Sequence, residues 1–382
     1  AHDRSSSRCD GGCRTSTVVP VTDPYLSPEG ATAPGPGGLA ARADAPSVVE
    51  LPPAHLELEW RPLVVADAPA LHRLLGVIEE ADASLSRTSA AAARELLTGD
   101  WKDLAADTLA GVDAGGELRA YAIVEVRPGD QRTVRAFLRG GIHPAWRGRG
   151  VGPALLRWME GRGRQMLAAS GKDVPGRLAV YVDEDQSDQR RLYAAAGFSP
   201  IRWYTQMRRP LAAPVLDATV PAGLQVVPWS EDLDDAVRLA HNEAFLDHWG
   251  TEPQTPETWR GHQSGFAPSW SFVALDPSGG DDAAAGSSPV VAGYLLSGRY
   301  EEDWPALGYS CGYTELLGVR PAYRGRGLAV ALLASAMEAY RADGMQYAAL
   351  SVDAANPSGA HTLYERLGYE RVHGEVLYSV EI

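Results

Sequence analysis

The chain has few cysteines, three among 382 residues, which is too few for a disulfide framework. Cys9 and Cys13 lie in a segment rich in Ser and Gly with only His2 nearby, and Cys311 leads into an apolar run. Histidines farther along the chain show no His-x-x-x-His spacing, and no Cys-x-x-Cys pair occurs. These absences argue against a bound metal, and we expect Cys311 to be a small buried residue.

Long apolar runs and an excess of positive charge are also lacking. No stretch approaches 18 uninterrupted apolar residues, and the first residues lack the apolar core of a signal peptide, so we expect a cytoplasmic protein that does not bind a membrane. A net charge of −14 argues against a basic face for nucleic acid. The acidity suits a cationic, amine-bearing partner, although a solvated acidic surface would give the same composition.

One motif occurs twice, each time after an apolar strand-like run and before an apolar helical run. The copies begin 177 positions apart and read Arg147-Gly148-Arg149-Gly150-Val151-Gly152 and Arg324-Gly325-Arg326-Gly327-Leu328-Ala329. Two similar downstream segments place Tyr193 and Tyr364 171 positions apart. Landmarks that recur in one order at nearly one offset predict tandem domains of a single fold. A chain of 382 residues is long enough for two cores.

The glycines of this motif predict a site for a phosphate group. After a strand, a glycine-rich turn lets the backbone approach a ligand closely, and the unpaired N–H groups at the start of the next helix point at an anion. The loop is not a Walker loop, because Gly-Lys-Ser/Thr is absent, and its glycines lack the G-x-G-x-x-G spacing of dinucleotide-binding proteins. The pattern that fits is Arg-x-x-Gly-x-Gly/Ala.

This pattern resembles the coenzyme A pyrophosphate loop of the Gcn5-related N-acetyltransferases, the GNAT superfamily. The segment from Asn356 to Tyr369 is similar to that family's second motif. The resemblance covers most of residues 57–382, and the tandem arrangement in an acidic chain resembles the mycothiol synthase group of actinobacterial acetyltransferases. It implies an α+β fold of two tandem GNAT (acyl-CoA N-acyltransferase) domains, each a mixed, mostly antiparallel sheet flanked by helices, with acetyl-CoA (coenzyme A) as cofactor.

Composition and periodicity divide the chain further. Residues 1–55 are rich in Ser, Pro, Gly and Ala without apolar periodicity and are predicted to form a disordered tail. Residues 56–210 and 223–382 repeat one order of predicted strands and helices. Residues 211–222 are predicted to be a linker stiffened by proline. We expect the first domain to be degenerate and the second to be catalytic.

The predicted strand before the second loop, residues 313–319, carries a candidate base. Acyl transfer to an amine benefits from a base at neutral pH, because aliphatic ammonium groups titrate near pH ~10. By strand alternation Glu315 would share a face with Tyr313, Leu317 and Val319. A carboxylate among apolar neighbours needs a partner or a function. Glu315 is therefore either the general base or an acid that pairs with an Arg or reaches solvent at the cleft rim.

The resemblance implies further roles. Tyr364 takes the position of the family's phenol that lies near the thioester sulfur and acts as general acid, and Asn356 that of the residue that bonds the pantetheine arm. Backbone groups of Leu317 and Val319, and of Ile142 in the first domain, would contact pantetheine. The two pyrophosphate cradles would consist of Arg147, Gly148, Arg149, Gly150, Val151 and Gly152 in the first domain and Arg324, Gly325, Arg326, Gly327, Leu328 and Ala329 in the second.

The first domain carries the same predicted scaffold with weaker chemistry. Leu138 stands where Glu315 stands in the second domain, Pro153 removes an N–H beside the first loop, and Asn356 has no clear counterpart. A helix that resembles the acceptor side of the mycothiol synthase group would line the acceptor pocket, unless its aromatic residues form a helix core. Its candidate substrate-binding residues are Asn242, Phe245, His248 and Trp249.

These observations predict an acetyl-CoA-dependent N-acetyltransferase that moves an acetyl group to a primary amine of a small molecule by direct transfer in a ternary complex. The alternative is a non-catalytic module that binds or senses acyl-CoA. The sequence leaves open which amine is the acceptor, how long the acyl group is, and whether the protein is a monomer or a homodimer.

Overall fold

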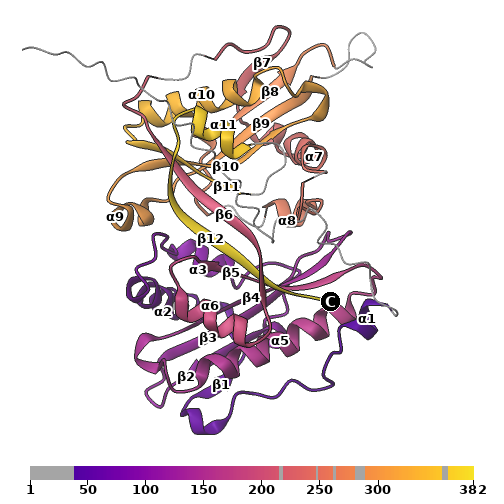
Figure 1. Cartoon of the computed structure of the whole chain (residues 1–382), viewed down its shortest axis with the longest axis vertical. Coiled ribbons are helices and arrows are strands. Elements are labelled where there is room, and N and C mark those ends of the chain that lie inside the picture. Colours follow the sequence, from indigo (N-terminus) through magenta and orange to yellow (C-terminus); the bar gives the residue numbers. More distant parts are fainter. Residues whose placement is uncertain (1–37, 215–217, 247, 261–263, 280–288, 355–359) are drawn as a thin grey trace, which may run out of the picture.

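The computed structural model describes residues 38–214, 218–246, 248–260, 264–279, 289–354 and 360–382 (Figure 1). In these residues twelve strands form one sheet in the order β1-β2-β3-β4-β5-β12-β6-β11-β10-β9-β8-β7. The strands are β1 (Glu59–Arg61), β2 (Thr108–Val112), β3 (Leu118–Val126), β4 (Val134–Ile142), β5 (Gly176–Asp183), β6 (Ser199–Pro210), β7 (Gln225–Pro228), β8 (Phe272–Asp276), β9 (Val290–Gly298), β10 (Cys311–Val319), β11 (Tyr347–Asp353) and β12 (Glu370–Glu381).

Helices cover both faces of the sheet in each half of the molecule (Figure 1). In the first half of the sheet, β1–β5, helices α5, α1 and α6 pack against one face, and α2, α3 and α4 pack against the other. The second half, β7–β11, packs α10 and α11 on one face and α7 and α8 on the other. The helices are α1 (Leu39–Arg42), α2 (Ala68–Ala81), α3 (Ala90–Glu95), α4 (Leu104–Asp107), α5 (Val151–Ala169), α6 (Ser187–Ala195), α7 (Asp234–Ala244), α8 (Pro256–Arg260), α9 (Trp304–Leu307), α10 (Leu328–Ala342) and α11 (Ala360–Arg366).

The sequence of each element accounts for this layering. Strands β3 and β9 are covered on both faces and read as nearly continuous apolar runs, as strands inside a three-layer structure do. Helix α10 contributes buried side chains along most of its length. The predicted α+β architecture, two similar halves with mixed, mostly antiparallel sheets flanked by helices, is confirmed. Within the described residues no helix is long and apolar enough to span a membrane.

Strands β6 and β12 cross between the two halves (Figure 1). Strand β6 follows α6 of the first half but pairs with β11 of the second, from Asp353↔Tyr204 to Tyr347↔Pro210. Strand β12 follows α11 of the second half but pairs with β5 of the first, from Glu375↔Asp183 to Glu381↔Arg177. The two crossing strands also pair with each other. Each half of the sheet is therefore completed by a strand that the other half supplies, and no edge is left at the junction.

Each half contains one parallel pair of strands that parts before its glycine-rich loop. Strand β10 pairs with β11 only from Cys311↔Tyr347 to Thr314↔Leu350, although β10 continues to Val319. Strand β4 pairs with β5 only from Val134↔Gly176 to Phe137↔Ala179, although β4 continues to Ile142. We call the unpaired stretches the second fork and the first fork. Each fork leaves backbone groups available to a ligand that enters between the strands.

The prediction of a disordered tail through residue 55 is wrong for residues 38–55. Leu39 in α1 is fully buried, and a Cβ built on Gly176 of β5 would lie 2.6 Å from its Cδ1. Side chains of α5 also bind this segment, since Arg164 Nη1 donates to Ala43 O at 2.9 Å and Gln165 Nε2 donates to Pro46 O at 2.8 Å. One buried leucine and hydrogen bonds to the backbone hold this segment in place. Neither produces a periodic pattern of apolar residues in the sequence. Residues 1–37 lie outside the described part of the chain.

Replacing Leu39 by alanine should lower the melting temperature by several degrees. The substitution leaves a cavity under α1, and truncations of this kind cost about 2–5 kcal/mol of unfolding free energy. The control is Leu51→Ala, because the Leu51 side chain is 57% exposed. Thermal unfolding followed by circular dichroism measures both variants, and equal melting temperatures would contradict the packing of this segment.

Candidate active site

The second glycine-rich loop forms an open cradle between β10 and α10. Gly325 and Gly327 adopt left-handed backbone angles, with φ of 73° and 85°, a region that glycine enters without steric cost. A Cβ built on either residue would meet no atom within 4 Å, so the space beside the turn is open. Gly327 caps α10, whose first amides have no acceptor within the helix. These features fit the pyrophosphate of coenzyme A.

The first arginine of each motif fastens its loop to the preceding strand. Arg324 Nε donates to Val319 O at 3.2 Å, and its Nη2 donates to Ala244 O at 2.6 Å. In the first half Arg147 Nε likewise donates to Ile142 O at 3.2 Å. The repeated arginine thus satisfies the last carbonyl of each delivering strand. The guanidinium therefore orders each loop, and in the first half its charge is also paired with the carboxylate of Asp82.

The second arginine of each motif lies over an aromatic ring at the entrance to the loop. The guanidinium carbon of Arg326 is 5.9 Å from the centre of the Tyr323 ring, and Arg326 Nη2 donates to Ala222 O at 3.3 Å. Arg149 lies 4.7 Å from the centre of the Trp146 ring. Because these residues are exposed, they can supply charge beside a bound phosphate.

A β-bulge lies where the second fork opens. The pairing of β10 with β9 shifts by one residue between Thr314 and Leu316, so Glu315 is an extra residue without an opposite partner. The pairing of β10 with β11 also ends at Thr314↔Leu350. The bulge therefore places Glu315 at the point where β10 and β11 part.

The bulge changes which side chains share a face of β10. Leu317 and Val319 pack against the core under α10, and the Thr314 hydroxyl also faces α10, where it lies 3.3 Å from a tyrosine hydroxyl. Glu315 and Tyr313 instead line a cavity on the opposite face. The expectation that Glu315 shares a face with Leu317 and Val319 is wrong, because the extra residue interrupts the alternation on which it depends.

Glu315 faces the cavity and is closely surrounded by protein. Burial raises the pKa of its carboxyl group, the hydrogen bond from the Tyr300 hydroxyl opposes this rise, and the charge of Asp303 adds to it. The side chain remains accessible to water inside the cavity. A ligand that fills the cavity would remove this water and strengthen the electrostatic interactions of the carboxylate.

The cavity has a volume of about 640 Å³ and lies between the two halves of the molecule. Residues 84–92, which connect α2 and α3 and begin α3, form its wall from the first half. The wall from the second half includes Arg299, Tyr300, Glu302, Asp303, Tyr309 and Tyr313. Figure 1 shows α3 and α9 facing each other across this junction. The crossing strand β12 contributes His373 and Glu375. The cavity is therefore a joint product of both halves.

Among the charged side chains that line the cavity, acidic ones outnumber basic ones: Asp183, Glu302, Asp303, Glu315 and Glu375 against Arg87 and Arg299. Burial raises the pKa of Glu375 to about 7, and the neighbouring charge of Asp183 adds to the shift. Burial likewise raises the pKa of Asp303 to about 6. His373 Nε2 lies 3.2 Å from an oxygen of Asp183. Clustered carboxyl groups favour a cationic ligand. Among the described residues, no group of three or more His, Cys, Asp or Glu side chains could hold a metal ion.

Tyr364 lies on α11, on the side of the second fork that faces α10. It packs against the same core cluster as Leu317 and Val319, with its ring centre 5.6 Å from that of Tyr369. Burial raises the pKa of the Tyr364 phenol to about 12, so the phenol keeps its proton at neutral pH. The predicted pantetheine contact Asn356 lies outside the described residues.

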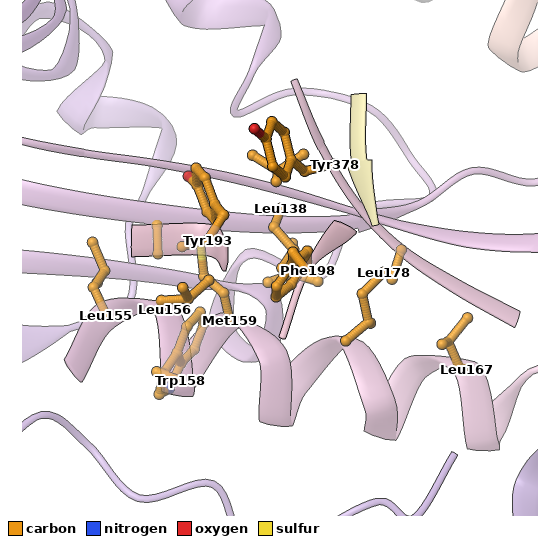
Figure 2. Packing of buried hydrophobic residues seen from close by; sticks show 14 of the residues in the cluster. Leu138, Leu155, Leu156, Trp158, Met159, Leu167, Leu178, Tyr193, Phe198 and Tyr378 are labelled. Carbon is orange, nitrogen blue, oxygen red and sulfur yellow. The ribbon is translucent and has the colours of Figure 1, made fainter. Parts of the chain in front are cut away.

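The first half has an equivalent loop and fork without the equivalent carboxylate. Gly148 and Gly150 adopt φ of 74° and 90°, but β4 pairs with β3 without a bulge. Leu138, at the position of Glu315, is buried in the core together with Tyr193 (Figure 2). A Cβ built on Gly150 would lie 3.7 Å from Leu56 Cδ2, so apolar side chains approach this loop. The remaining first-loop candidates Ile142, Val151 and Gly152 lie beside Leu56 and Leu192.

The four predicted acceptor residues do not line the cavity. Asn242 Nδ2 donates to Gln254 O at 3.1 Å, and Phe245 stacks on His241 with a ring separation of 4.7 Å. His248 Nδ1 lies 3.0 Å from Trp249 O.

Trp249 instead belongs to a contact between the second half and the first. The guanidinium carbons of Arg177 and Arg202 lie 4.8 and 4.4 Å from the centre of its ring. Nearby, the buried Glu252 carboxylate accepts backbone N–H groups of the turn between β3 and β4, with distances of 2.9 to 3.1 Å from Gln131, Arg132 and Thr133. The segment after α7 thus fastens the two halves together. The cavity residues Tyr300 and Glu375 belong to no sequence motif. They could not be predicted from the sequence, because the strand exchange brings them to the same cavity.

A fork of parallel strands with an anion cradle at its open end and a carboxylate at its closed end is the architecture of an acyl-CoA-dependent transferase. The sequence model of the Acetyltransferase (GNAT) family matches residues 235–369. The chain is 30% identical over 269 residues to a mycothiol acetyltransferase of Nocardia farcinica, a match that covers 69% of this chain and 80% of the relative. It is 32% identical over 250 residues to a mycothiol acetyltransferase of Streptomyces avermitilis, which covers 63% of this chain and 70% of the relative.

Solved structures agree with these relatives. A GCN5-related N-acetyltransferase from Sphaerobacter thermophilus superposes with a TM-score of 0.61 at 28% identity, covering 87% of this chain and 97% of that one. A tandem GNAT protein from the clavulanic acid biosynthesis pathway superposes with a TM-score of 0.61 at 19% identity, covering 85% and 98%, and supports the fold. The chain belongs to the acetyltransferase (GNAT) family, and it is an N-acetyltransferase that uses acetyl-CoA.

Substitutions in the two loops should separate the roles of the halves. Gly327→Val should lower kcat/KM for acetyl-CoA by roughly 100-fold or more, because its side chain would enter the open cradle and displace the cofactor. Gly150→Val is the matched control, since φ is 85° at Gly327 and 90° at Gly150 and both changes impose similar backbone strain. Steady-state kinetics should show the Gly150 variant little changed. The reverse order of effects would assign the chemistry to the first half.

Proposed function

We propose that this N-acetyltransferase acts on a primary amine of a small cationic molecule, by direct transfer while cofactor and acceptor are both bound, with Glu315 as general base and Tyr364 as general acid. We also propose that the acceptor is the des-acetyl amine of mycothiol. The observation that carries the proposal is the position of Glu315, which lies where the second fork meets the cavity between the halves.

Two separate approaches to Glu315 support a ternary complex. The glycine-rich cradle and the unpaired edge of β10 lead to it along the fork, beside Leu317, Val319 and Tyr364. The cavity leads to it from the opposite face of β10. Acetyl-CoA would supply the acetyl thioester at the closed end of the fork. An acceptor in the cavity could attack that carbonyl without either molecule leaving first.

The electrostatics of the cavity suit an ammonium acceptor that must lose a proton. Acidic side chains attract the cation, and Glu315 would then remove a proton, directly or through one water molecule. Burial moves the pKa of Glu315 upward from its usual value, which brings it closer to the working pH and makes the carboxylate a stronger base. The neutral amine that results can act as the nucleophile.

Tyr364 would complete the proton transfers on the other side of the fork. The departing thiolate needs a proton, and a buried phenol with a pKa of about 12 holds one throughout the neutral range. Backbone N–H groups at the open edge of β10 would stabilise the charge that develops on the carbonyl oxygen. Asn356 remains a candidate contact to the pantetheine arm.

The similarity of this chain to mycothiol acetyltransferases supports the des-acetyl form of mycothiol as the acceptor. Mycothiol acetyltransferases from Nocardia farcinica and Streptomyces avermitilis match this chain over 80% and 70% of their own lengths. A cavity of about 640 Å³ also has the size of a site for a small molecule, since such sites span about 300–1,000 Å³.

Incubation of the protein with acetyl-CoA and a panel of amines tests this proposal. The panel includes des-acetyl mycothiol, amino-acid derivatives and an aminoglycoside, and mass spectrometry detects the acetylated product because the acceptor's own thiol would obscure release of coenzyme A. Acetylation of des-acetyl mycothiol with the highest kcat/KM is expected. Preference for another amine would overturn the choice of acceptor, and acetyl-CoA binding without acetylation of any amine would overturn the reaction.

Tyr364→Phe should lower kcat by roughly 100-fold or more while leaving the affinity for acetyl-CoA nearly unchanged. The substitution removes one hydroxyl and keeps the ring that packs near Tyr369. Steady-state kinetics with calorimetric binding of coenzyme A measures both quantities. An unchanged kcat, with single-turnover measurements showing that chemistry limits the rate, would rule out the role.

Glu315→Gln should lower kcat/KM by roughly 100-fold or more near neutral pH, the loss expected for a general base. The pKa of Glu315 is raised by burial, so the wild-type rate should fall as the pH drops through that raised value, and the variant should lack this dependence. Above the pKa of the acceptor amine, free amine is abundant and the variant should approach the wild type. Parallel pH profiles for the two enzymes would contradict the assignment.

A further inference from the structure

The Tyr300 ring occupies a space that two glycines leave open beside Glu315. Tyr300 lies two residues beyond β9, where a Cβ built on Gly298 would come within 2.5 Å of the ring and a Cβ built on Gly265 within 2.4 Å. The ring also meets Tyr313 edge to face, with the ring centres 6.0 Å apart. Backbone on two sides and an aromatic ring on a third thus fix the direction of the phenol.

The phenol lies beside the Glu315 carboxylate. A Cβ built on Gly298 would lie 2.9 Å from Tyr300 Cζ and 2.9 Å from Glu315 Oε1, so the phenol and the carboxylate are neighbours on the cavity wall. Burial and the charge of Glu315 raise the pKa of Tyr300 well above its usual value. The phenol is therefore protonated at every pH at which the enzyme works, and towards the carboxylate it acts as a donor.

The other groups near Glu315 do not favour its ionised form. Asp303, in the turn before α9, raises the pKa of Glu315 through its charge. The Tyr313 hydroxyl donates instead to Gln206 Oε1 at 3.3 Å. Tyr340 of α10 lies 2.7 Å from the Ser297 hydroxyl oxygen on the other face of the sheet. Tyr300 is the group that opposes burial and Asp303 among those that shift the pKa of Glu315.

We propose that Tyr300 is a positioning residue for the acetyl transfer: its hydroxyl donates a hydrogen bond to the Glu315 carboxylate, holds it in the ionised form and aims it at the acceptor amine. This inference rests on the proposed role of Glu315 as base. A carboxylate in this cavity without such a donor would take up a proton at a higher pH and turn more freely. The glycines at positions 265 and 298 serve the same purpose, since any side chain there would displace the phenol.

Tyr300→Phe keeps the ring and removes the donor. The acid limb of the kcat/KM profile should then move to higher pH, because loss of the hydrogen bond raises the pKa of Glu315. We expect a loss of roughly tenfold on the acid side of the profile, where Glu315 is mostly protonated in both enzymes, and a much smaller loss on the plateau above it, as one hydrogen bond to a charged group shifts an equilibrium by about that ratio. KM for acetyl-CoA and the melting temperature should stay nearly unchanged.

The matched control is Tyr309→Phe, which removes a hydroxyl from another tyrosine of the same cavity, one whose ring centre lies 4.5 Å from the Arg208 guanidinium carbon. It should leave the acid limb in place. An equal loss at all pH values in the Tyr300 variant, or the same shift in the Tyr309 variant, would overturn the proposal, because a merely structural hydroxyl would not move the titration of the base.

Infrared difference spectroscopy provides a readout that does not require turnover. With Glu315→Gln as the reference, the carbonyl band of protonated Glu315 should persist to higher pH in Tyr300→Phe than in the wild type. An unshifted band would overturn the proposal even if the amine acceptor were identified correctly. A shifted band in a protein that acetylates no amine would leave the role of Tyr300 towards Glu315 intact and would locate the failure in the proposed reaction.

Discussion

The exchange of β6 and β12 between the halves is the constraint on which the candidate site depends. Because β12 pairs with β5 and β6 pairs with β11, the two halves share one continuous sheet. This pairing brings His373 and Glu375 of β12 and the 84–92 segment of the first half to the same cavity as Glu315. The contact of Trp249 with Arg177 and Arg202 fastens the opposite side of the junction. The first half therefore contributes a wall of the site even though it lacks a carboxylate of its own.

A single extra residue distinguishes the two forks. In β10 the bulge frees Glu315 from the ladder and directs it into the cavity, whereas in β4 the regular ladder directs Leu138 into the core beside Tyr193. The same backbone plan thus directs a carboxylate into the cavity in one half and an apolar side chain into the core in the other. Bulges re-aim side chains without changing the fold, which allows a duplicated domain to lose its chemistry while keeping its structure.

Local features of the site could be predicted from the sequence, and features that depend on distant pairing could not. The glycines of both loops indicate left-handed turns at helix starts, and the structure has them at Gly325 and Gly327. Strand β10 includes the predicted strand residues 313–319. The bulge at Glu315 was not predicted, because alternation assumes a regular strand. The packing of residues 38–55 was not predicted, because their apolar anchor is a leucine in a four-residue helix. The strand exchange cannot be recognised from the repeated sequence, because β6 and β12 would have the same lengths whichever half they completed.

The central claim is that acetyl transfer occurs at Glu315, between a cofactor in the second fork and an acceptor in the cavity that both halves build. A crystal structure of the protein with coenzyme A and des-acetyl mycothiol tests it most directly. The account predicts the coenzyme A sulfur at the closed end of the second fork, near Thr314, with the acceptor nitrogen in the cavity within hydrogen-bond reach of Glu315 or of a water bound to it. A sulfur at the first fork beside Leu138, or an acceptor amine outside the cavity, would contradict it.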